Sequence, residues 1–298
     1  EKVGIDLSEA IFKEPNNTSK FSEVPKLNIE VKPGKTLDGV GKFVEDKIPL
    51  VDDSDKVIDE LIESNAEILV NLLPVGSEEA VKYYAECAIK AKVGFINCIP
   101  VFIARDKEWY KKFKDNNVPL IGDDIKSQVG ATIVHRALAQ LFSDRGIELK
   151  RSYQLNVGGN MDFLNMLEED RLETKRTSKT SSVTSVANKG KGMDPDNVRI
   201  GPSDYVKWLE DRKKAFIRLE GEAFGGVPLN IEVQLEVWDS PNSAGVVIDA
   251  IRYMKFFTDK KDLDSLDLVS AWLMKAPAKT SKDTDTLNKL HELTHQEN

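Results

Sequence analysis

Two lysines four residues apart, Lys175 and Lys179, are the residues whose types and spacing most directly suggest chemistry. On a helix, this spacing places both ammonium groups on one face. The polar loop at residues 156–162 precedes them and can bring amides and a carboxylate close by. Converging cations beside such a loop favour a phosphorylated substrate that forms an oxyanion. A stretch rich in lysine, serine and threonine is also typical of a solvated loop.

Further blocks accompany this pair along the chain. They are Gly-Asp-Asp-Ile-Lys-Ser at 122–127, Tyr-Val-Lys at 205–207, Trp-Asp-Ser-Pro-Asn-Ser-Ala-Gly at 238–245 and Trp-Leu-Met-Lys-Ala-Pro at 272–277. In this order and approximate spacing, the blocks resemble those of myo-inositol-1-phosphate synthases of the shorter archaeal and bacterial type. The resemblance covers nearly the whole chain, from Lys2-Val-Gly-Ile-Asp-Leu-Ser to the block that contains Lys275.

The resemblance implies a reaction in which D-glucose 6-phosphate becomes 1L-myo-inositol 1-phosphate without net redox change. In that family, bound NAD oxidises the C5 hydroxyl, C6 loses a proton and closes onto the C1 aldehyde, and the stored hydride reduces the ring ketone. Hydride transfer needs a nicotinamide held over C5. The enolate and the aldol alkoxide need positive charge, and the phosphate needs cationic anchors.

The resemblance also assigns catalytic residues by matching motif. They are Lys175, Lys179, Lys207, Lys275, Asp124, Asp239 and Asn156. Mutual repulsion and partial burial are expected to lower some lysine pKa values, so that one lysine exchanges protons near neutral pH. The two aspartates would orient ammonium groups or relay protons. Asp239 is also typical of a residue that caps a helix, since Pro241 follows it.

The matching motifs further imply residues that bind the cofactor. They are Pro74, Gly76, Ser77, Cys98, Asp124, Ser127, Asn160, Asp162, Lys175, Asp239 and Ser240. Asn156, Asn160 and Asp162 match the family pattern Asn-x-x-Gly-Asn-x-Asp, whereas Met161 stands where asparagine is common. The resemblance to the archaeal type implies a divalent metal ion, for which Asp124 and Asp162 are the candidate ligands. Two carboxylates far apart in sequence do not establish a metal site.

Composition limits the classes of function. The 298 residues are 40% hydrophobic and 31% charged, as in soluble globular proteins. The net charge of −8 disfavours nonspecific binding to nucleic acid, which needs a basic surface. We see no signal peptide and no apolar run of the ~20 residues that span a bilayer. Cys87 and Cys98 form no disulfide framework. We therefore expect a cytoplasmic protein without nucleic-acid or membrane partners.

The first half of the chain alternates helical patterns with short apolar runs. We predict helices at 56–64, 77–92 and 106–115, and strands at 67–73, 94–98 and 118–121. This alternation predicts a doubly wound, Rossmann-like parallel sheet. Ligands of such sheets bind at the carboxyl ends of the strands, where residues 74–77, 97–100 and 122–124 lie. Ser77 is expected to cap the helix that follows it.

The pattern changes after residue 131. A predicted helix at 131–141 contains His135, which we expect to be a packing or surface residue. Runs at 216–220 and 229–237 alternate with a period of two, and a Gly-Gly pair between them favours antiparallel strands. The prediction is an α/β fold whose NAD-binding domain, residues 1–130 plus 240–298, is interrupted by an α+β catalytic and oligomerisation domain at 131–239. The resemblance implies a homotetramer.

Two segments carry further expectations. Residues 174–203 are rich in Ser, Thr, Lys and Gly, which predicts a loop that orders as a lid when phosphate binds. The sequence opens at Glu1, just beyond the second strand of the resembled family, so we expect it to lack the first β-α-β unit. The residue that distinguishes NAD from NADP would lie on that strand.

Three functions compete at this point. The first is the NAD-dependent isomerase that the motifs imply. The second is an NAD(P)-dependent oxidoreductase that acts on a phosphorylated sugar or polyol held by the lysines. The third is a catalytically inactive binding or assembly module.

Overall fold

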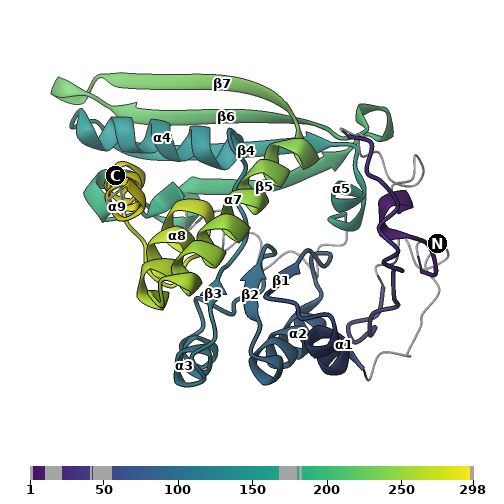
Figure 1. The fold of residues 1–298 in the computed structure, drawn as a ribbon. Coiled ribbons are helices and arrows are strands. Elements are labelled where there is room, and N and C mark those ends of the chain that lie inside the picture. Colours follow the sequence, from purple (N-terminus) through teal and green to yellow (C-terminus); the bar gives the residue numbers. More distant parts are fainter. Residues whose placement is uncertain are drawn as a thin grey trace.

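The computed structural model describes residues 3–10, 22–40, 42, 56–167, 180 and 183–295. Two β-sheets organise these residues, and Figure 1 shows the larger sheet above the smaller one. Helices α7 (Asp239–Asp259) and α8 (Leu266–Leu273) pack together beside the smaller sheet. None of the helices in the described part of the chain is long and apolar enough to cross a membrane.

The smaller sheet is parallel, with the strand order β1 (Ile68–Asn71), β2 (Gly94–Asn97), β3 (Leu120–Ile121). Helix α1 (Val57–Glu63) precedes β1, and helices α2 (Glu78–Ala91) and α3 (Lys107–Asp115) connect the strands. The strands are short and rich in apolar residues, as expected for a sheet that is buried on both faces.

Consecutive residues of β2 enter cores on opposite faces of this sheet. Phe95 packs with α2 and α3, and its neighbour Ile96 packs with α7, α8 and α9 (Asp283–His295). The buried partners are Val81, Ala85 and Phe113 on one face, and Met254, Val269 and Leu290 on the other. Helices on both faces confirm the predicted doubly wound fold.

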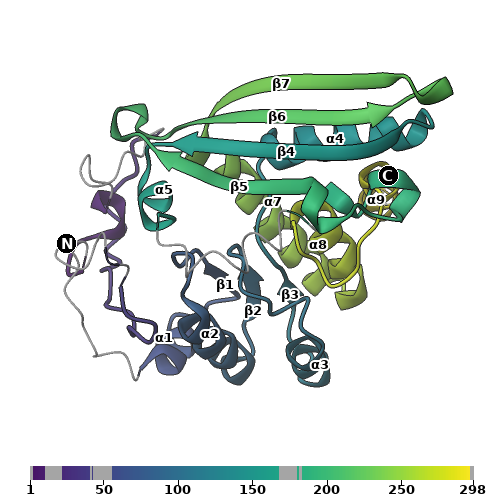
Figure 2. The same cartoon turned by 180° about the vertical axis from the view of Figure 1, so that it is seen from behind.

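The larger sheet has the order β5 (Val198–Tyr205), β4 (Glu148–Gly158), β6 (Arg212–Glu222), β7 (Pro228–Trp238). Strands β4 and β5 are parallel, and the other pairs are antiparallel. Helix α4 (Ala131–Asp144) covers one face and buries Phe142 against Ile217 and Leu219. No α-helix in the described part of the chain lies across the opposite face, which Figure 2 shows in front.

Strands β4 and β5 were not predicted, because β4 reverses the usual pattern. Its polar residues Ser152, Gln154 and Asn156 are buried on the α4 side, whereas Tyr153, between them, is exposed. Helix α5 (Met161–Asn165) and α8 were missed as well. The hydrophobic alternation that predicts strands therefore holds in β6 and β7 and fails in β4.

The prediction of a lid at 174–203 is wrong for residues 183–203. Val183, Val186 and Ala187 are buried in the core beneath α4, and β5 begins at Val198. These few apolar residues are sufficient to attach this part of the segment to the larger sheet. Apart from Thr180, the remainder of the segment up to residue 182 lies outside the described residues.

The predicted cap of helix α2 is also wrong. The Ser77 side chain makes no capping hydrogen bond. Instead the Asp38 carboxylate accepts hydrogen bonds from the backbone amides of Glu79 and Ala80 at 2.8 and 2.9 Å. A residue about forty positions upstream thus satisfies amides at the first turn, which only the tertiary fold could arrange.

Candidate active site

Polar side chains meet at the carboxyl ends of the three parallel strands. Asn71 Nδ2 donates to Asn97 Oδ1 at 2.8 Å, and Asn97 Nδ2 donates to Asp123 Oδ1 at 2.7 Å. Asp123 also accepts hydrogen bonds from the backbone amides of residues 103–105 at 3.0 to 3.1 Å. Burial raises the pKa of the Asp123 carboxyl to about 7, although these hydrogen bonds act to lower it. This buried network fixes the loops that follow β2 and β3.

The next residue, Asp124, points toward Lys275. Residues 123–126 run antiparallel to residues 273–276, and the Lys275 amide donates to the Asp124 carbonyl at 2.7 Å. The Lys275 ammonium donates to Asp124 Oδ1, also at 2.7 Å. Asp124 has a φ of 62°, in the left-handed region that aspartate tolerates better than most residues. Two backbone segments therefore fix this first ammonium–carboxylate pair.

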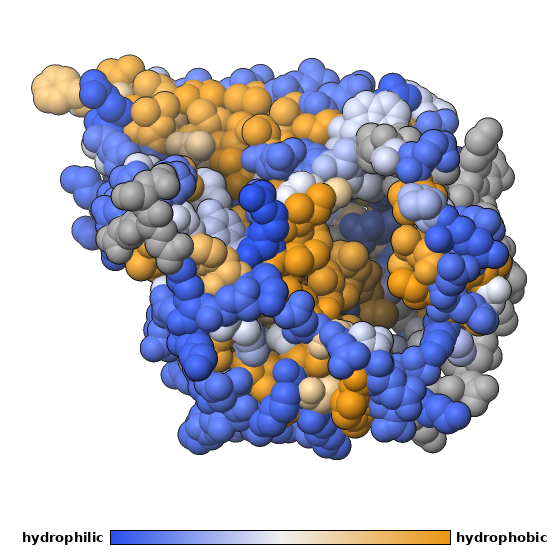
Figure 3. All heavy atoms as spheres, viewed as in Figure 1, coloured by the Kyte–Doolittle hydropathy of each residue, from blue (hydrophilic) through white to orange (hydrophobic). Residues whose placement is uncertain are grey.

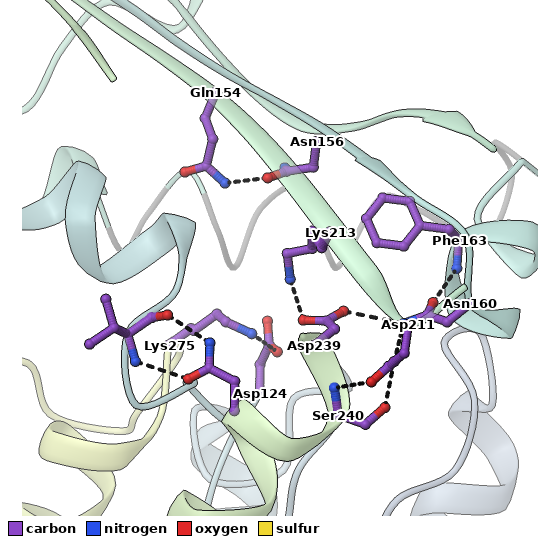
Figure 4. Close-up of polar contacts among 12 residues, drawn as sticks. Asp124, Gln154, Asn156, Asn160, Phe163, Asp211, Lys213, Asp239, Ser240 and Lys275 are labelled. Carbon is purple, nitrogen blue, oxygen red and sulfur yellow. Dashed lines mark hydrogen bonds and ion pairs between the residues drawn. The ribbon is translucent and has the colours of Figure 1, made fainter. Parts of the chain in front are cut away.

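A second pair forms where the larger sheet meets α7. Lys213 lies near the start of β6, opposite Gly158, and its ammonium donates to Asp239 Oδ1 at 2.6 Å (Figure 4). Burial acts to lower the pKa of Lys213, but Asp239, Asp162 and Asp124 outweigh it, so that the pKa is raised. Lys213 is thus paired with Asp239, and the negative charges of Asp162 and Asp124 further favour its ammonium form.

Asp211 connects this pair to the loop after β4. Its carboxylate accepts hydrogen bonds from the Ser240 hydroxyl at 2.7 Å and from the Ser240 amide at 3.0 Å. Asn160 Nδ2 donates to Asp211 at 3.2 Å and lies 3.4 Å from Asp239 Oδ2. Asn160 also caps α5 through the Phe163 amide. Asp239 is the first residue of α7, where the N-cap position is Trp238 and makes no side-chain capping bond, and the Asp239 carboxylate binds Lys213.

A cavity of about 480 Å³ opens beside these groups. It lies between the strand ends, α5 and the start of α7, and Figure 3 shows this hollow with hydrophobic residues on its walls. Seven predicted site residues line it: Pro74, Cys98, Asp124, Asn160, Asp162, Asp239 and Ser240. Leu73, Ile99, Pro100, Ile125 and Met161 supply much of the apolar wall.

Other predicted residues lie outside this lining. Gly76, Ser77 and Ser127 are half-buried and lie within three residues of the lining residues Val75 and Asp124 in the sequence. Lys275 does not line the cavity, but its ammonium group binds Asp124, which does. Asn156 is fully buried and binds Gln154 and Gly201. Lys207 is exposed in the short 3-10 helix η6 (Lys207–Leu209). Lys175 and Lys179 lie outside the described residues.

Sequence reasoning missed Lys213 and Asp211. The signal for Lys213 was its period-two alignment with Ala215 and Ile217, which places all three on the buried face of β6. We instead selected Lys207 from the Tyr-x-Lys motif. A lysine on the buried face of a strand needs an oppositely charged partner, and here the partner is Asp239. No comparable pattern in the sequence pointed to Asp211.

Two potential chemistries find little support at this site. Burial raises the pKa of the Cys98 thiol to about 12, so a nucleophilic thiolate is disfavoured at neutral pH. Among the described residues, no group of three or more His, Cys, Asp and Glu side chains is arranged to hold a metal ion. Of the candidate metal ligands, Asp124 binds an ammonium ion, so we derive no metal-dependent step.

Comparison with known proteins identifies the family. Residues 130–240 match the model of the family described as myo-inositol-1-phosphate synthase. An inositol-3-phosphate synthase of Mycolicibacterium smegmatis is 58% identical over 287 residues, which are 95% of this chain and 79% of that protein.

Two solved structures resemble the chain along nearly its whole length. The crystal structure of Ari2 matches 98% of this chain and 79% of its own, with 34% identity and a TM-score of 0.71. A myo-inositol-1-phosphate synthase-related protein from Thermotoga maritima matches 99% of this chain and 84% of its own, with a TM-score of 0.76. At 23% identity, the second likeness supports the fold. The chain belongs to the family of myo-inositol-1-phosphate synthases, also called inositol-3-phosphate synthases.

Proposed function

We propose that this chain is an isomerase that converts D-glucose 6-phosphate to 1L-myo-inositol 1-phosphate, with NAD as its cofactor. The proposed steps are internal oxidation, enolisation, intramolecular aldol closure and re-reduction. The observation that carries the proposal is the convergence of two ammonium–carboxylate pairs, Lys275–Asp124 and Lys213–Asp239, beside one cavity. The family of the chain supports the same reaction.

The cavity suits a nicotinamide cofactor. It lies at the carboxyl edge of a parallel sheet, where doubly wound folds bind nucleotides. Its apolar wall can hold a flat ring, and Asn160 and Ser240 offer polar groups that can bind a carboxamide. When NAD is bound, it supplies a hydride acceptor that can return the hydride at the end of the reaction.

The two lysines would stabilise negative charge that develops on the substrate. Lys213 remains protonated because its pKa is raised, so it is suited to donate hydrogen bonds to an oxyanion or a phosphate and not to remove a proton. Asp239 holds its ammonium in place from α7. Asp124 orients Lys275 from the opposite side of the site, in the same way. Lys175 and Lys179 are proposed as further cationic contacts from the sequence motif.

Anaerobic incubation with glucose 6-phosphate and NAD distinguishes the three candidate functions. An isomerase forms inositol phosphate and accumulates no NADH. A simple dehydrogenase accumulates NADH in proportion to the substrate consumed. An inactive binding module gives neither product. Formation of NADH without inositol phosphate would contradict our proposal.

We further propose that the protein is a homo-oligomer, a tetramer by family resemblance. The face of the larger sheet opposite α4 bears Tyr153 and Phe216, which are 36% and 38% exposed. Leu155, aligned with Phe216, lies between them. Aromatic and aliphatic side chains on a sheet face that no α-helix of the described residues covers favour contact with another subunit.

A further inference from the structure

A hydrogen-bonded chain of buried polar groups crosses the core beneath α4. His135 on α4 contacts Ser152 Oγ through Nε2 at 2.6 Å and Gln154 Oε1 through Nδ1 at 3.2 Å. Gln154 Nε2 donates to Asn156 Oδ1 at 3.1 Å, as Figure 4 shows. Asn156 Nδ2 donates to the Gly201 carbonyl of β5 at 2.9 Å. All four side chains are at most 4% exposed.

The Gly201 carbonyl fixes the direction of the hydrogen bonds between Asn156 and His135 Nδ1. A carbonyl oxygen can only accept, so Asn156 must present Nδ2 to it and Oδ1 to Gln154. Gln154 must then present Nε2 to Asn156 and Oε1 to His135. The proton of neutral His135 must therefore be on Nδ1. The single proton of the Ser152 hydroxyl has two acceptors within reach, His135 Nε2 at 2.6 Å and the Arg218 carbonyl at 2.8 Å. Burial lowers the pKa of His135 to about 4, which agrees with a neutral ring.

The chain ends beside a bulge in strand β5, where Ser203 is an extra residue between the partners of Asn156 and Val157. The pairing of β4 with β5 shifts between Asn156 and Val157, and the partner of Asn156 is Pro202, which has no amide hydrogen. The Asn156 side chain supplies a hydrogen bond to β5 at this irregular position. Such a bulge bends the strand that carries it, here β5, after which the Val206 amide donates to the Gly158 carbonyl at 2.9 Å. At the end of β4, Gly158 lies opposite Lys213, and Asn160, two residues later, binds Asp211 and lines the cavity.

We propose that His135 is a positioning residue of the active site. By donating from Nδ1 to Gln154, it fixes the Asn156 amide, which ties β4 to β5 next to the bulge and so holds Gly158 and Asn160 beside the Lys213–Asp239 pair. His135 itself touches neither the cavity lining nor these charged groups. The effect on turnover rests on the proposed function, whereas the hydrogen-bonding state of His135 does not.

Three variants separate positioning from stability. His135→Leu keeps a buried apolar side chain but removes the donor, and we expect kcat for inositol phosphate formation to fall roughly tenfold or more, as for a displaced site group. His135→Asn retains an N–H near the place of Nδ1, and its kcat should stay within about threefold of the wild type. Leu219→Ala is the matched control: it creates a cavity in the same core, so the protein loses stability and keeps its kcat.

A His135→Leu variant with the kcat of the Leu219→Ala control would overturn the proposal, as would a His135→Asn variant no better than His135→Leu. Nitrogen NMR of the ¹⁵N-labelled full chain gives an independent readout. It should show the Nδ1–H tautomer at His135, and an Nε2–H tautomer would contradict the chain. If the wild-type protein forms no inositol phosphate, the proposed function fails, and the tautomer still decides whether the hydrogen-bonded chain exists.

Discussion

At the scale of single residues, the two paired lysines are the central test of the site. Lys213→Met and Lys275→Met should each lower kcat by roughly a hundredfold or more, the loss expected for one preorganised oxyanion donor. Lys207→Met should lie within about threefold of the wild type, because Lys207 is exposed on η6. Thermal unfolding must accompany the assay, because removing Lys213 leaves Asp239 without this ion pair. A large loss of kcat in Lys207→Met with a normal kcat in Lys213→Met would support Lys207 as the catalytic lysine, as the Tyr-x-Lys motif predicts.

Asp123 gives a second test, of stability. Each of its carboxylate oxygens accepts two hydrogen bonds. In an asparagine variant, an NH2 group would replace one of these oxygens. In either orientation of the side chain, that NH2 group would face two N–H donors. Asp123→Asn should therefore lower the free energy of unfolding by on the order of 3 kcal/mol despite its unchanged shape.

The matched control for Asp123 is Asp106→Asn, at the cap of α3. There a single oxygen accepts both amide hydrogen bonds, and asparagine can do the same. Urea denaturation of both variants measures the difference. Equal stabilities would show that the buried network around Asp123 tolerates a donor.

At the scale of elements, helix α2 tests capping by a distant residue. Asp38→Ala should lower the free energy of unfolding by about 1 kcal/mol, because two amides of the first turn lose their acceptor. Ser77→Ala should change it by less than about 0.5 kcal/mol, since Ser77 makes no capping bond. Chemical denaturation decides between them, and the reverse order would show that Ser77 caps α2 in solution.

The core between α4 and the larger sheet predicts a pH dependence of stability. Burial lowers the pKa of His135 to about 4, whereas an unfolded histidine titrates near 6.5. As the pH falls from about 6.5 to about 4, His135 binds a proton in the unfolded chain but stays neutral in the folded protein. The wild type should therefore lose up to about 3 kcal/mol of stability over this range relative to His135→Asn. Denaturation series at several pH values measure this, and parallel curves would count against a neutral buried ring.

At the scale of the whole molecule, the exposed face of the larger sheet predicts assembly. Phe216→Glu places a charge at the centre of this face, and light scattering should show a smaller species than for the wild type. Ile62→Glu, at an exposed position on α1, is the control that should retain the wild-type mass. A monomeric wild type would remove the homo-oligomer proposal, and unchanged mass in Phe216→Glu would exclude this face as the interface.

The sequence was sufficient for elements whose pattern is local. Short apolar runs between helical segments predicted the parallel sheet, since strands buried on both faces must be apolar throughout. The alternation in β6 and β7 predicted an antiparallel pair. The ordered motifs identified the family and seven residues of the cavity lining. The division into domains at 130/131 and 239/240, and the catalytic and cofactor-binding roles of the predicted site residues, remain predictions from the sequence.

Only the tertiary structure decided which charges meet. Lys213 and Asp239 are 26 positions apart, and Lys275 and Asp124 are 151 apart, so no local pattern pairs them. Strand β4 escaped prediction because its polar residues face the core, where His135 and Gly201 satisfy their hydrogen bonds. Hydrophobic periodicity assumes that buried side chains are apolar. At this active site the buried groups are polar, and the residues that make their burial tolerable come from other elements of the fold.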